Sequence, residues 1–298
     1  MNNKLISIIS VNFNGLEDTL EMLESVIRHV TLPYEIIVVD NGSRVDETAA
    51  IKARYPRVVT IRSDRNLGFA GGNNLGIRAA RGNYLFFINN DAVVKDDSLH
   101  FLVERLDSSP EIGAVSPKIR FAWDGNPVQF AGYTPLSGIT LRNALIGFMR
   151  PDDGSYDTPA PTPYIHGAAF MVKKEVIARA GYMPELYFLY YEELDWSERM
   201  ADAGYALWYE PAAVVYHKES RSTGRMSPLK VYYMTRNRLI YAVRNRRGGV
   251  RRMSIIYQLS AAVAKQNLLF LFKREFSLLN ASLRGVKDFI KNYKRCGC

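Results

Sequence analysis

Polar side chains that can bind a cation or a nucleotide stand directly after apolar runs of this sequence. The run at residues 85–88 (LFFI) stops abruptly at Asn89, Asn90 and Asp91. Two amides and a carboxylate are typical of a turn. They are also oxygen ligands of the kind that hold a hard cation. Either the chain simply turns here, or a positive group is held at the end of a strand.

Two earlier apolar runs end in the same way. Residues 6–11 (ISIISV) lead into Asn12 and Asn14, and residues 35–40 (EIIVVD) end in Asp40. In open α/β sheets, ligands bind beyond the carboxyl ends of the strands. We therefore expect these polar clusters to lie along one edge of one sheet.

The elements that must position these side chains alternate regularly. Near-continuous Val and Ile runs predict strands buried on both faces, at residues 6–11, 35–40, 58–63 and 84–89. Helix-like stretches separate them, at residues 17–29, 46–55 and 70–80. This alternation predicts an α/β doubly wound fold, in which a mostly parallel sheet is flanked by helices.

The glycine pattern disfavours the two commonest nucleotide-binding loops. The first strand is followed by a single glycine, Gly15, instead of G-x-G-x-x-G, and no G-x-x-x-x-G-K-[ST] loop occurs. Glycines gather instead in residues 66–77 (NLGFAGGNNLGI), before a predicted helix. Gly71 and Gly72 at the start of that helix would let the chain approach a ligand closely, or would only make a tight connection.

Four stretches in order resemble glycosyltransferase family 2, the inverting enzymes with the GT-A fold, and in particular its rhamnosyltransferase-like branch. They are SVNFNG, IIVVDNGSRVDET, RNLGFAGGNNLGI and YLFFINNDAVV, and the resemblance runs through roughly residues 5–240. It implies a nucleotide-diphosphate sugar donor, a divalent cation, and transfer with inversion at the anomeric carbon. The implied donor is a dTDP or UDP sugar, with dTDP-rhamnose as the most specific expectation.

The resemblance also assigns roles to the strand-end residues. Asp91 would bind the metal that bridges the two phosphates of the donor, although Asn89 stands where the family commonly has a second acid. Asp40 would accept a hydrogen bond from N3–H of uracil or thymine. Further nucleotide contacts are expected from Asn12, Arg65, Asn66, Gly71, Asn73 and Asn90. Turn chemistry at residues 89–91, and an Asx turn or helix N-cap at Asp40, are the structural alternatives.

A second group of acids lies further along the chain. Residues 166–185 (HGAAFMVKKEVIARAGYMPE) resemble the acceptor-side segment of the family, a strand followed by a short helix. Glu192 and Glu193 then precede an amphipathic helix, at a place where the family usually has Glu-Asp with the second acid as general base. The resemblance therefore assigns the base to Glu193, with Glu192 and Asp195 as fallbacks. A carboxylate must take the proton of the acceptor hydroxyl as the new bond forms. Acids favoured by the dipole of a helix N-terminus are the alternative.

A histidine completes the expected metal site. His217 ends the apolar run at residues 212–216, at the place where the family has a metal-binding histidine. A histidine ligand suits Mn²⁺ better than Mg²⁺, and both cations stay open. A purely structural histidine is the alternative. Several neighbours could cover the diphosphate, namely Lys218, Arg221, Ser222 and Arg225.

Charge is divided unevenly along the chain. The net charge is +9, yet residues 225–298 alone carry +15 (17 Lys and Arg against two acids), and residues 1–224 carry −6. Residues 232–254 alternate aromatics with arginines, and the apolar stretch at 255–279 is broken by Lys265, so it falls short of a spanning helix. We expect basic amphipathic helices that bind an anionic membrane surface. Packing on the catalytic domain is the alternative, and the long apolar stretches disfavour nucleic acid.

The domain organisation follows from this division. Residues 1–224 are expected to form the catalytic domain, with a nucleotide-sugar half at about 1–95 and an acceptor half at about 96–224, and residues 225–298 to form a helical extension. The only cysteines, Cys296 and Cys298, cannot staple a core and indicate a reducing compartment. The apolar N-terminal stretch reads as a first strand and not as a signal peptide.

The expected function is therefore that of a cytoplasmic enzyme, peripheral on the inner face of the membrane. It would transfer a sugar to a growing, lipid-linked cell-surface glycan. Two alternatives stay open. A nucleotidyltransferase would normally carry a phosphate loop rich in glycine and lysine after the first strand, which is missing here. A non-catalytic protein that binds nucleotide sugars would be favoured if Glu193 lay far from the metal pocket.

Overall fold

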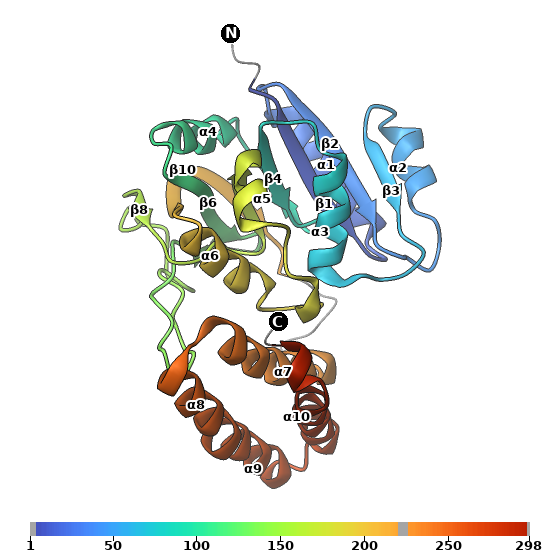
Figure 1. Cartoon of the computed structure of the whole chain (residues 1–298). Coiled ribbons are helices and arrows are strands. Elements are labelled where there is room, and N and C mark those ends of the chain that lie inside the picture. Colours follow the sequence, from blue (N-terminus) through green and yellow to red (C-terminus); the bar gives the residue numbers. More distant parts are fainter. Residues whose placement is uncertain (1–3, 220–225, 297–298) are drawn as a thin grey trace.

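One ten-stranded sheet forms the centre of the protein (Figure 1). The computed structural model describes residues 4–219 and 226–296, with side chains as far as residue 293. The strand order is β3-β2-β1-β4-β9-β6-β10-β5, with β7 beside β6 and β8 beside β10. The strands are β1 (Ile6–Asn12), β2 (Tyr34–Asp40), β3 (Val59–Arg62), β4 (Tyr84–Ile88), β5 (Ala92–Val93), β6 (Ile112–Phe121), β7 (Val128–Phe130), β8 (Ala160–Pro161), β9 (Ala169–Lys173) and β10 (Ala206–His217).

Helices flank this sheet and continue into a helical C-terminal region. They are α1 (Leu16–His29), α2 (Thr48–Arg54), α3 (Gly68–Ala79), α4 (Leu99–Asp107), α5 (Lys174–Ala180), η1 (Glu185–Tyr187), α6 (Glu192–Asp202), α7 (Pro228–Asn245), α8 (Gly248–Tyr257), the π-helical η2 (Gln258–Val263), α9 (Ala264–Phe272) and α10 (Phe276–Cys296). The predicted α/β fold with a helical C-terminal extension is confirmed.

Strand direction brings the predicted polar clusters to one edge of the sheet. β1, β2, β3 and β4 are mutually parallel, with Asn12 opposite Asp40 in the register. β9 runs antiparallel to both β4 and β6, and β10 is parallel to β6. The carboxyl ends of β1, β2, β4, β6 and β10 therefore share an edge with the amino end of β9.

Alternate side chains of the central strands feed two separate cores. Ile8 and Val38 lie in the core on one face of the sheet, and their neighbours Ile9 and Val39 lie in the core on the other. Burial on both faces explains why these strands read as continuous apolar runs. β3 differs, because it is the edge strand and Val59 is exposed. The expectation of burial on both faces is wrong for this strand.

The glycine-rich stretch corrects a second expectation. α3 begins at Gly68, so Gly71 and Gly72 lie inside the helix and not at its start. A Cβ on Gly72 would come within 2.8 Å of Val11, and one on Gly76 within 2.4 Å of Ile9. These two glycines let α3 lie against β1 at close range.

α7 fixes the turn that leads into α6. Phe188, Tyr190 and Tyr191 all have positive φ angles, which strains a backbone that carries large side chains. The buried amide of Asn237 donates hydrogen bonds to the carbonyl oxygens of Tyr187, Leu189 and Tyr190, at 3.0, 2.7 and 2.8 Å. The predicted domain boundary at residues 224 and 225 lies outside the described residues and stays a prediction.

α8, η2 and α9 follow one another without a break as a single helical rod at the end of the molecule away from the sheet (Figure 1). We call residues 248–272 the α8–α9 rod. It contacts the rest of the protein through apolar side chains, Ile255, Leu259 and Phe270, and through polar ones. Ser254 donates to the carbonyl oxygen of Ile139 at 2.9 Å, and Gln258 donates to that of Thr140 at 3.0 Å. α10 then returns along α7.

Candidate active site

Asp91 and His217 meet at the shared edge of the sheet. Asp91 Oδ1 lies 3.1 Å from His217 Nε2, and both side chains are largely buried. The β10–β5 pairing places His217 opposite Ala92, directly after Asp91. Burial acts to raise the pKa of Asp91, but the hydrogen bond and charge of His217 and the nearby Lys218 outweigh it, so the pKa lies below its usual value.

Gln129 is a member of this site that sequence reasoning missed. Its Oε1 lies 2.9 Å from His217 Nδ1, and the contact is buried. An amide oxygen there accepts a hydrogen bond from Nδ1–H, which leaves Nε2 facing Asp91. Gln129 lies on β7, a strand of only three residues, which was not predicted from the sequence.

The donor set fits a divalent cation. With Nδ1–H bonded to Gln129, the Nε2 lone pair of His217 faces a carboxylate oxygen at 3.1 Å. Two acceptors at that distance require a proton or a cation between them. One carboxylate and one imidazole suit Mn²⁺, with phosphate oxygens completing the shell. Within the described chain, no group of three or more His, Cys, Asp or Glu residues could form a closed protein site.

The two flanking asparagines are also in place. Asn89 Nδ2 lies 3.4 Å from His217 Nε2. Asn90 points away, and its amide donates to Gly15 O and Thr19 Oγ1 at 3.3 and 3.2 Å. Asn89 thus adjoins the Asp91–His217 pair, whereas Asn90 connects the end of β4 to the start of α1.

Glu192 and Glu193 occupy the first turn of α6. Glu192 is almost fully buried, and its Oε2 has no hydrogen-bond partner among the residues that the structure describes. Burial, and after it the charge of Glu193, raises the pKa of Glu192 well above its usual value. Burial also raises the pKa of Glu193 to about 7. Glu193 is the more exposed of the pair and is poised to change its protonation state near neutrality.

Asp195, the second fallback for the base, holds neighbouring elements together. Its Oδ2 accepts hydrogen bonds from Tyr187, Arg244 and Asn245 at 2.7, 2.8 and 3.0 Å. These contacts tie α6 to η1 and to the end of α7. A carboxylate held in this way anchors elements and is not free to approach a substrate.

The predicted nucleotide contacts at β1 and β2 are bonded within the protein. Asp40 is fully buried, and its oxygens accept from the backbone N–H groups of Ser43 and Glu47 at 3.0 and 3.4 Å. Arg62 lies 3.6 Å from the same carboxylate. Asn12 donates to Glu47 at 2.6 Å and accepts from Thr19 at 2.9 Å. These contacts build the loop after β2, and a role in base recognition stays a prediction.

The glycine-rich turn holds the remaining predicted contacts. Asn66 Oδ1 accepts from Gly68 N at 2.8 Å, while Arg65 is exposed. Asn73 is buried in α3 and donates to Phe69 O at 3.0 Å. A Cβ on Gly71 would meet the side chain of Leu67 at 2.6 Å. Of these four residues, Arg65 is the one whose side chain is open to solvent.

Basic residues were also expected beside the diphosphate. Lys218 donates to Asp18 and Glu21 of α1 at 2.6 and 2.7 Å, and its backbone N–H donates to Asp91 O at 3.0 Å. Arg221, Ser222 and Arg225 lie outside the described residues.

His166 and Tyr133 lie near the two groups of the site, His166 near His217 and Tyr133 near Glu193. Their rings are stacked, with centroids 6.1 Å apart and planes 18° apart. Burial, and after it the nearby His217, lowers the pKa of His166 to about 3, so the ring is neutral. Burial, and after it the charge of Glu193, raises the pKa of Tyr133.

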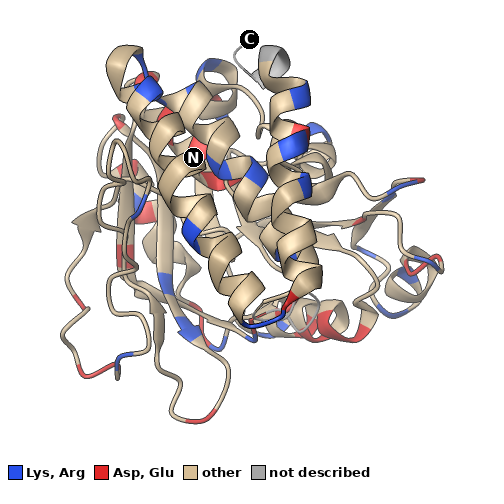
Figure 2. Ribbon diagram, turned by 90° about the horizontal axis from the view of Figure 1, so that it is seen from below, with Lys and Arg blue, Asp and Glu red and all other residues tan. Residues whose placement is uncertain are grey.

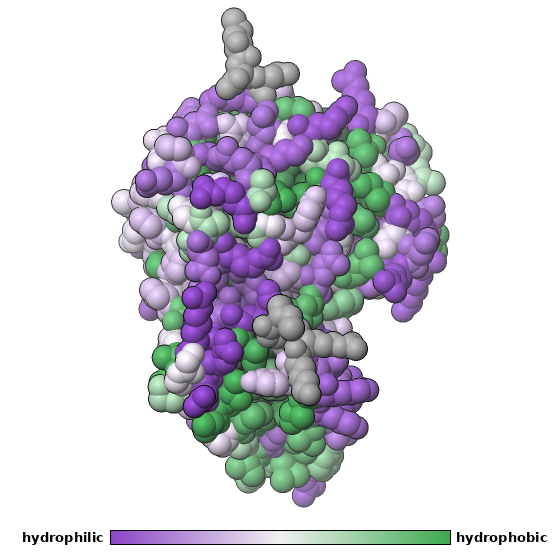
Figure 3. Space-filling model, viewed as in Figure 1, coloured by the Kyte–Doolittle hydropathy of each residue, from purple (hydrophilic) through white to green (hydrophobic). Residues whose placement is uncertain are grey.

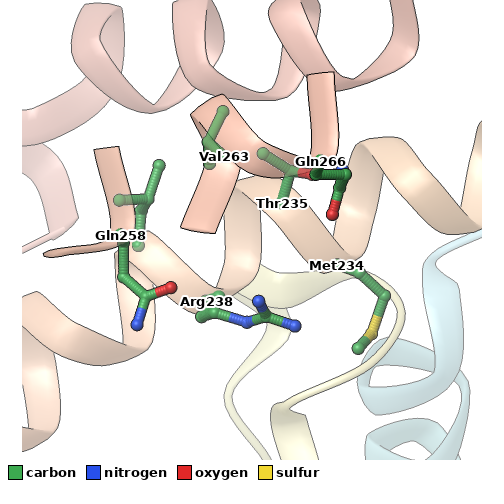
Figure 4. A pocket seen from close by; sticks show the side chains of 7 residues that line it. Met234, Thr235, Arg238, Gln258, Val263 and Gln266 are labelled. Carbon is green, nitrogen blue, oxygen red and sulfur yellow. The ribbon is translucent and has the colours of Figure 1, made fainter. Parts of the chain in front are cut away.

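A separate cavity lies inside the C-terminal helices (Figure 4). Its lining comes from α7, η2 and α9, and Figure 4 shows Arg238 between Gln258 and Met234. None of the predicted site residues lines it. Arg238 donates to the hydroxyl of Tyr191 at 3.0 Å, which joins this region to the residue before Glu192.

Comparisons with known proteins identify the family that this chain resembles. The family model "Glycosyl transferase family 2" matches residues 7–179. N-acetylglucosaminyl-diphospho-decaprenol L-rhamnosyltransferase of Mycobacterium tuberculosis is 24% identical over 241 residues, covering 74% of this chain and 78% of that protein. The low-salt glycan biosynthesis hexosyltransferase Agl10 of Haloferax volcanii is 26% identical over 240 residues, covering 79% and 74%.

Solved structures show the same architecture. GalNAc-T7 with UDP, GalNAc and Mn²⁺ superposes with a TM-score of 0.63 at 16% identity, over 87% of this chain and 56% of that one. S. aureus TarS 1–349 with UDP-GlcNAc gives 0.62 at 16% identity, over 96% and 80%. The mannosyltransferase PcManGT of Pyrobaculum calidifontis, with GDP-Man and Mn²⁺, gives 0.57 at 17% identity, over 96% and 75%. At these identities the likeness shows the fold alone, which is GT-A.

Proposed function

The chain belongs to glycosyltransferase family 2, and we propose that this glycosyltransferase moves rhamnose from dTDP-rhamnose to a lipid-linked glycan, with inversion at the anomeric carbon. The observation that carries the proposal is the arrangement at the sheet edge, where Glu193 and the Asp91–His217 pair flank residues 166–168. This arrangement supports catalysis over mere binding of a nucleotide sugar. Family membership argues against a nucleotidyltransferase.

The choice of sugar and acceptor has support from a relative. The name of the mycobacterial relative specifies L-rhamnose transfer and a lipid-linked diphosphate acceptor. The Haloferax relative is named only as a hexosyltransferase, so the donor sugar is the most specific part of the proposal.

Donor binding would use the Asp91–His217 pair. Asp91 and His217 would hold Mn²⁺ or Mg²⁺ together with the donor phosphates. When bound, such a cation neutralises charge that develops on the leaving nucleoside diphosphate. Gln129 keeps the His217 ring oriented for this task, as partners of metal-binding histidines generally do.

Glu193 would act as the general base. It accepts the proton of the acceptor hydroxyl while the hydroxyl oxygen attacks the anomeric carbon from the face opposite the diphosphate. Burial holds the pKa of Glu193 at about 7, which suits a base that works near neutral pH. Glu192 beside it is the more deeply buried acid and is kept neutral, so the two carboxylates do not repel each other.

A membrane-bound acceptor is supported by the α8–α9 rod, which leaves much of its apolar surface uncovered. Ile255, Leu259 and Phe270 pack against the neighbouring helices, whereas Ile256, Leu268 and Phe272 are 63, 66 and 88% exposed. Apolar surface gathers at this end of the molecule (Figure 3). Seen from below, the helices of this end also carry more Lys and Arg than acids (Figure 2). Exposed apolar side chains beside basic ones are typical of a helix that lies in a membrane interface.

The rod is also, among the described residues, the one helix that is long and apolar enough to cross a membrane. It has 25 residues, and an 18-residue window within it has a mean hydropathy of 1.3 and little burial. A spanning orientation would remove Ser254 and Gln258 from their partners Ile139 and Thr140. We therefore favour a peripheral position on the cytoplasmic face of the membrane, with the rod in the plane of the interface.

A binding screen tests the proposed function. The full chain is heated with Mn²⁺ and a panel of nucleotide sugars, and the shift in unfolding temperature is measured. dTDP-rhamnose should stabilise the protein more than UDP-GlcNAc or GDP-mannose, because a ligand stabilises the state that binds it. A larger shift with another nucleotide sugar would make that sugar, and not rhamnose, the proposed donor. The absence of any shift across the panel would contradict the proposed donor class.

A further inference from the structure

Residues 166–168 connect the two halves of the candidate active site. A Cβ on Gly167 would lie 4.0 Å from the carboxyl carbon of Glu193. Next along the chain, Ala168 O accepts from the backbone N–H of Asn89 at 2.9 Å, and the amide of Asn89 reaches His217. The segment therefore has the base on one side and the metal pair on the other.

This position determines which part of the substrate the segment faces. In an inverting displacement, the leaving group and the attacking group lie on opposite sides of the anomeric carbon. If the diphosphate is at Asp91 and His217 and the acceptor hydroxyl is at Glu193, the transferred sugar ring lies between them. A side chain between the two sites then contacts the sugar.

His166 presents a hydrogen-bond donor at that place. The backbone N–H of Ala168 donates to His166 Nδ1 at 3.2 Å. Because a backbone N–H can only donate, Nδ1 is unprotonated, and the neutral ring carries its proton on Nε2. No residue that the structure describes accepts a hydrogen bond from Nε2, and the side chain is partly open to solvent.

The ring of His166 is held firmly. Phe130 packs on it with a centroid distance of 5.0 Å, and Tyr133 stacks at 6.1 Å. The backbone N–H of His166 is fixed by Ser116 Oγ at 3.1 Å. A donor fixed in direction by its packing selects for an acceptor at one position.

We propose that His166 is a specificity-determining residue that donates a hydrogen bond from Nε2 to a hydroxyl of the transferred sugar. The inference rests on the proposed function, because it needs the diphosphate and the acceptor hydroxyl at the two flanking sites. A site built to bond a substrate hydroxyl discriminates strongly against sugars that lack it, since its own donor is then left unpaired.

Two variants separate the roles of the two ring nitrogen atoms. His166→Asn keeps an oxygen near the Nδ1 position for Ala168 and removes the Nε2 donor. His166→Gln keeps an amide N–H near the Nε2 position and loses the Nδ1 acceptor. Calorimetry with Mn²⁺ measures the Kd of each variant for dTDP and for dTDP-rhamnose, with UDP and UDP-GlcNAc as the second pair of probes.

The expected result is a selective loss. His166→Asn should weaken binding of the nucleotide sugar about 3- to 10-fold, the usual value of one hydrogen bond, and should leave the nucleoside diphosphate unchanged. His166→Gln should recover most of the loss. Thermal denaturation checks that both variants are folded.

Other outcomes overturn the inference in distinguishable ways. Equal weakening of the diphosphate and the sugar nucleotide would show that His166 only supports the metal pair. Unchanged affinity for both would show that the sugar does not touch His166. A wild-type protein that binds neither probe would contradict the proposed function itself, before His166 is considered.

Discussion

At the scale of the single residue, Asp91 is the proposed metal ligand of the donor site. Asp91→Asn removes the negative charge opposite His217 and turns a strong oxygen ligand into a weak one. Binding of dTDP in the presence of Mn²⁺ should weaken at least about 10-fold, because outer-shell changes alone typically cost 10–100-fold in metal affinity. Calorimetry with Mn²⁺ and with a chelator measures the effect. An affinity that is unchanged by the substitution and by the chelator would remove the metal from this site.

Glu193 and Glu192 form a matched pair for testing the base. Glu193→Gln keeps the size of the side chain and removes the proton acceptor, so turnover should fall about 10²–10⁴-fold. Donor affinity should stay near that of the wild type. Glu192→Gln is the control, because Glu192 is held neutral and an amide resembles a protonated carboxyl. If only Glu192→Gln loses turnover, the roles of the two acids are reversed.

The pKa of Glu193 sets a pH dependence of activity. The base works only as a carboxylate, and burial raises its pKa to about 7. As pH falls below about 7 the carboxyl becomes protonated, so kcat/KM should decline roughly tenfold per pH unit. The residual activity of Glu193→Gln should not show this decline. A wild-type profile that is flat between pH 5 and 7 would mean that the base titrates at its ordinary pKa or is another group.

At the scale of elements, α6 depends on a turn that α7 holds in place. Asn237→Ala would remove the amide donor shared by the carbonyl oxygens of Tyr187, Leu189 and Tyr190, although Arg236 would still donate to Tyr187 O. We expect a loss of about 1–3 kcal/mol in the free energy of unfolding, the range for a buried polar group that loses its hydrogen bond. Urea denaturation measures it, and turnover should fall as well, because the strained turn precedes Glu192. Asn280→Ala on α10, an exposed asparagine, is the control and should be neutral.

Sequence periodicity predicted the elements better than it predicted the roles of side chains in them. The apolar runs located β1, β2, β4 and the end of β10, because burial on both sheet faces leaves a clear signal. The acids at the start of α6 look alike in the sequence. Glu192 and Asp195 are buried, whereas Glu193 is partly exposed. Asp195 is held by Arg244 and Asn245, which lie about fifty residues further on.

Contacts between distant segments explain the other features that could not be predicted from the sequence. Gln129 reaches His217 from a strand of three residues, too short to read from a pattern. For Gly71 and Gly72 the sequence left open a close approach to a ligand or a tight connection, because glycine permits close approach of any group. In the fold the group that approaches Gly72 is β1. Residue type limited the chemistry in each case, and tertiary packing decided which partner each residue meets.

At the scale of the whole molecule, the division of charge and the exposed apolar side chains of the α8–α9 rod both favour the proposed membrane contact. The acidic part of the chain, residues 1–224, carries the sheet and its site, and the basic helices end in exposed apolar side chains. Each Lys or Arg near an anionic surface contributes about 1 kcal/mol, and the effect fades beyond a Debye length. A buried Leu or Phe adds about 1.5–3 kcal/mol. A few contacts of each kind give reversible binding.

The final prediction concerns this surface. Co-sedimentation of the full chain with vesicles should require anionic lipid and should weaken as salt is raised. Replacing Leu268 and Phe272 with Ser should lower the partition coefficient about 10-fold or more, since both side chains are exposed on the rod and would leave the bilayer. Val45→Ser is the matched control, because Val45 is equally exposed but lies in the loop after β2. Equal binding to neutral vesicles at high salt would indicate insertion of the rod across the bilayer. A double variant that binds like the wild type would show that the rod faces another partner, and an effect of Val45→Ser would place the contact on the catalytic domain.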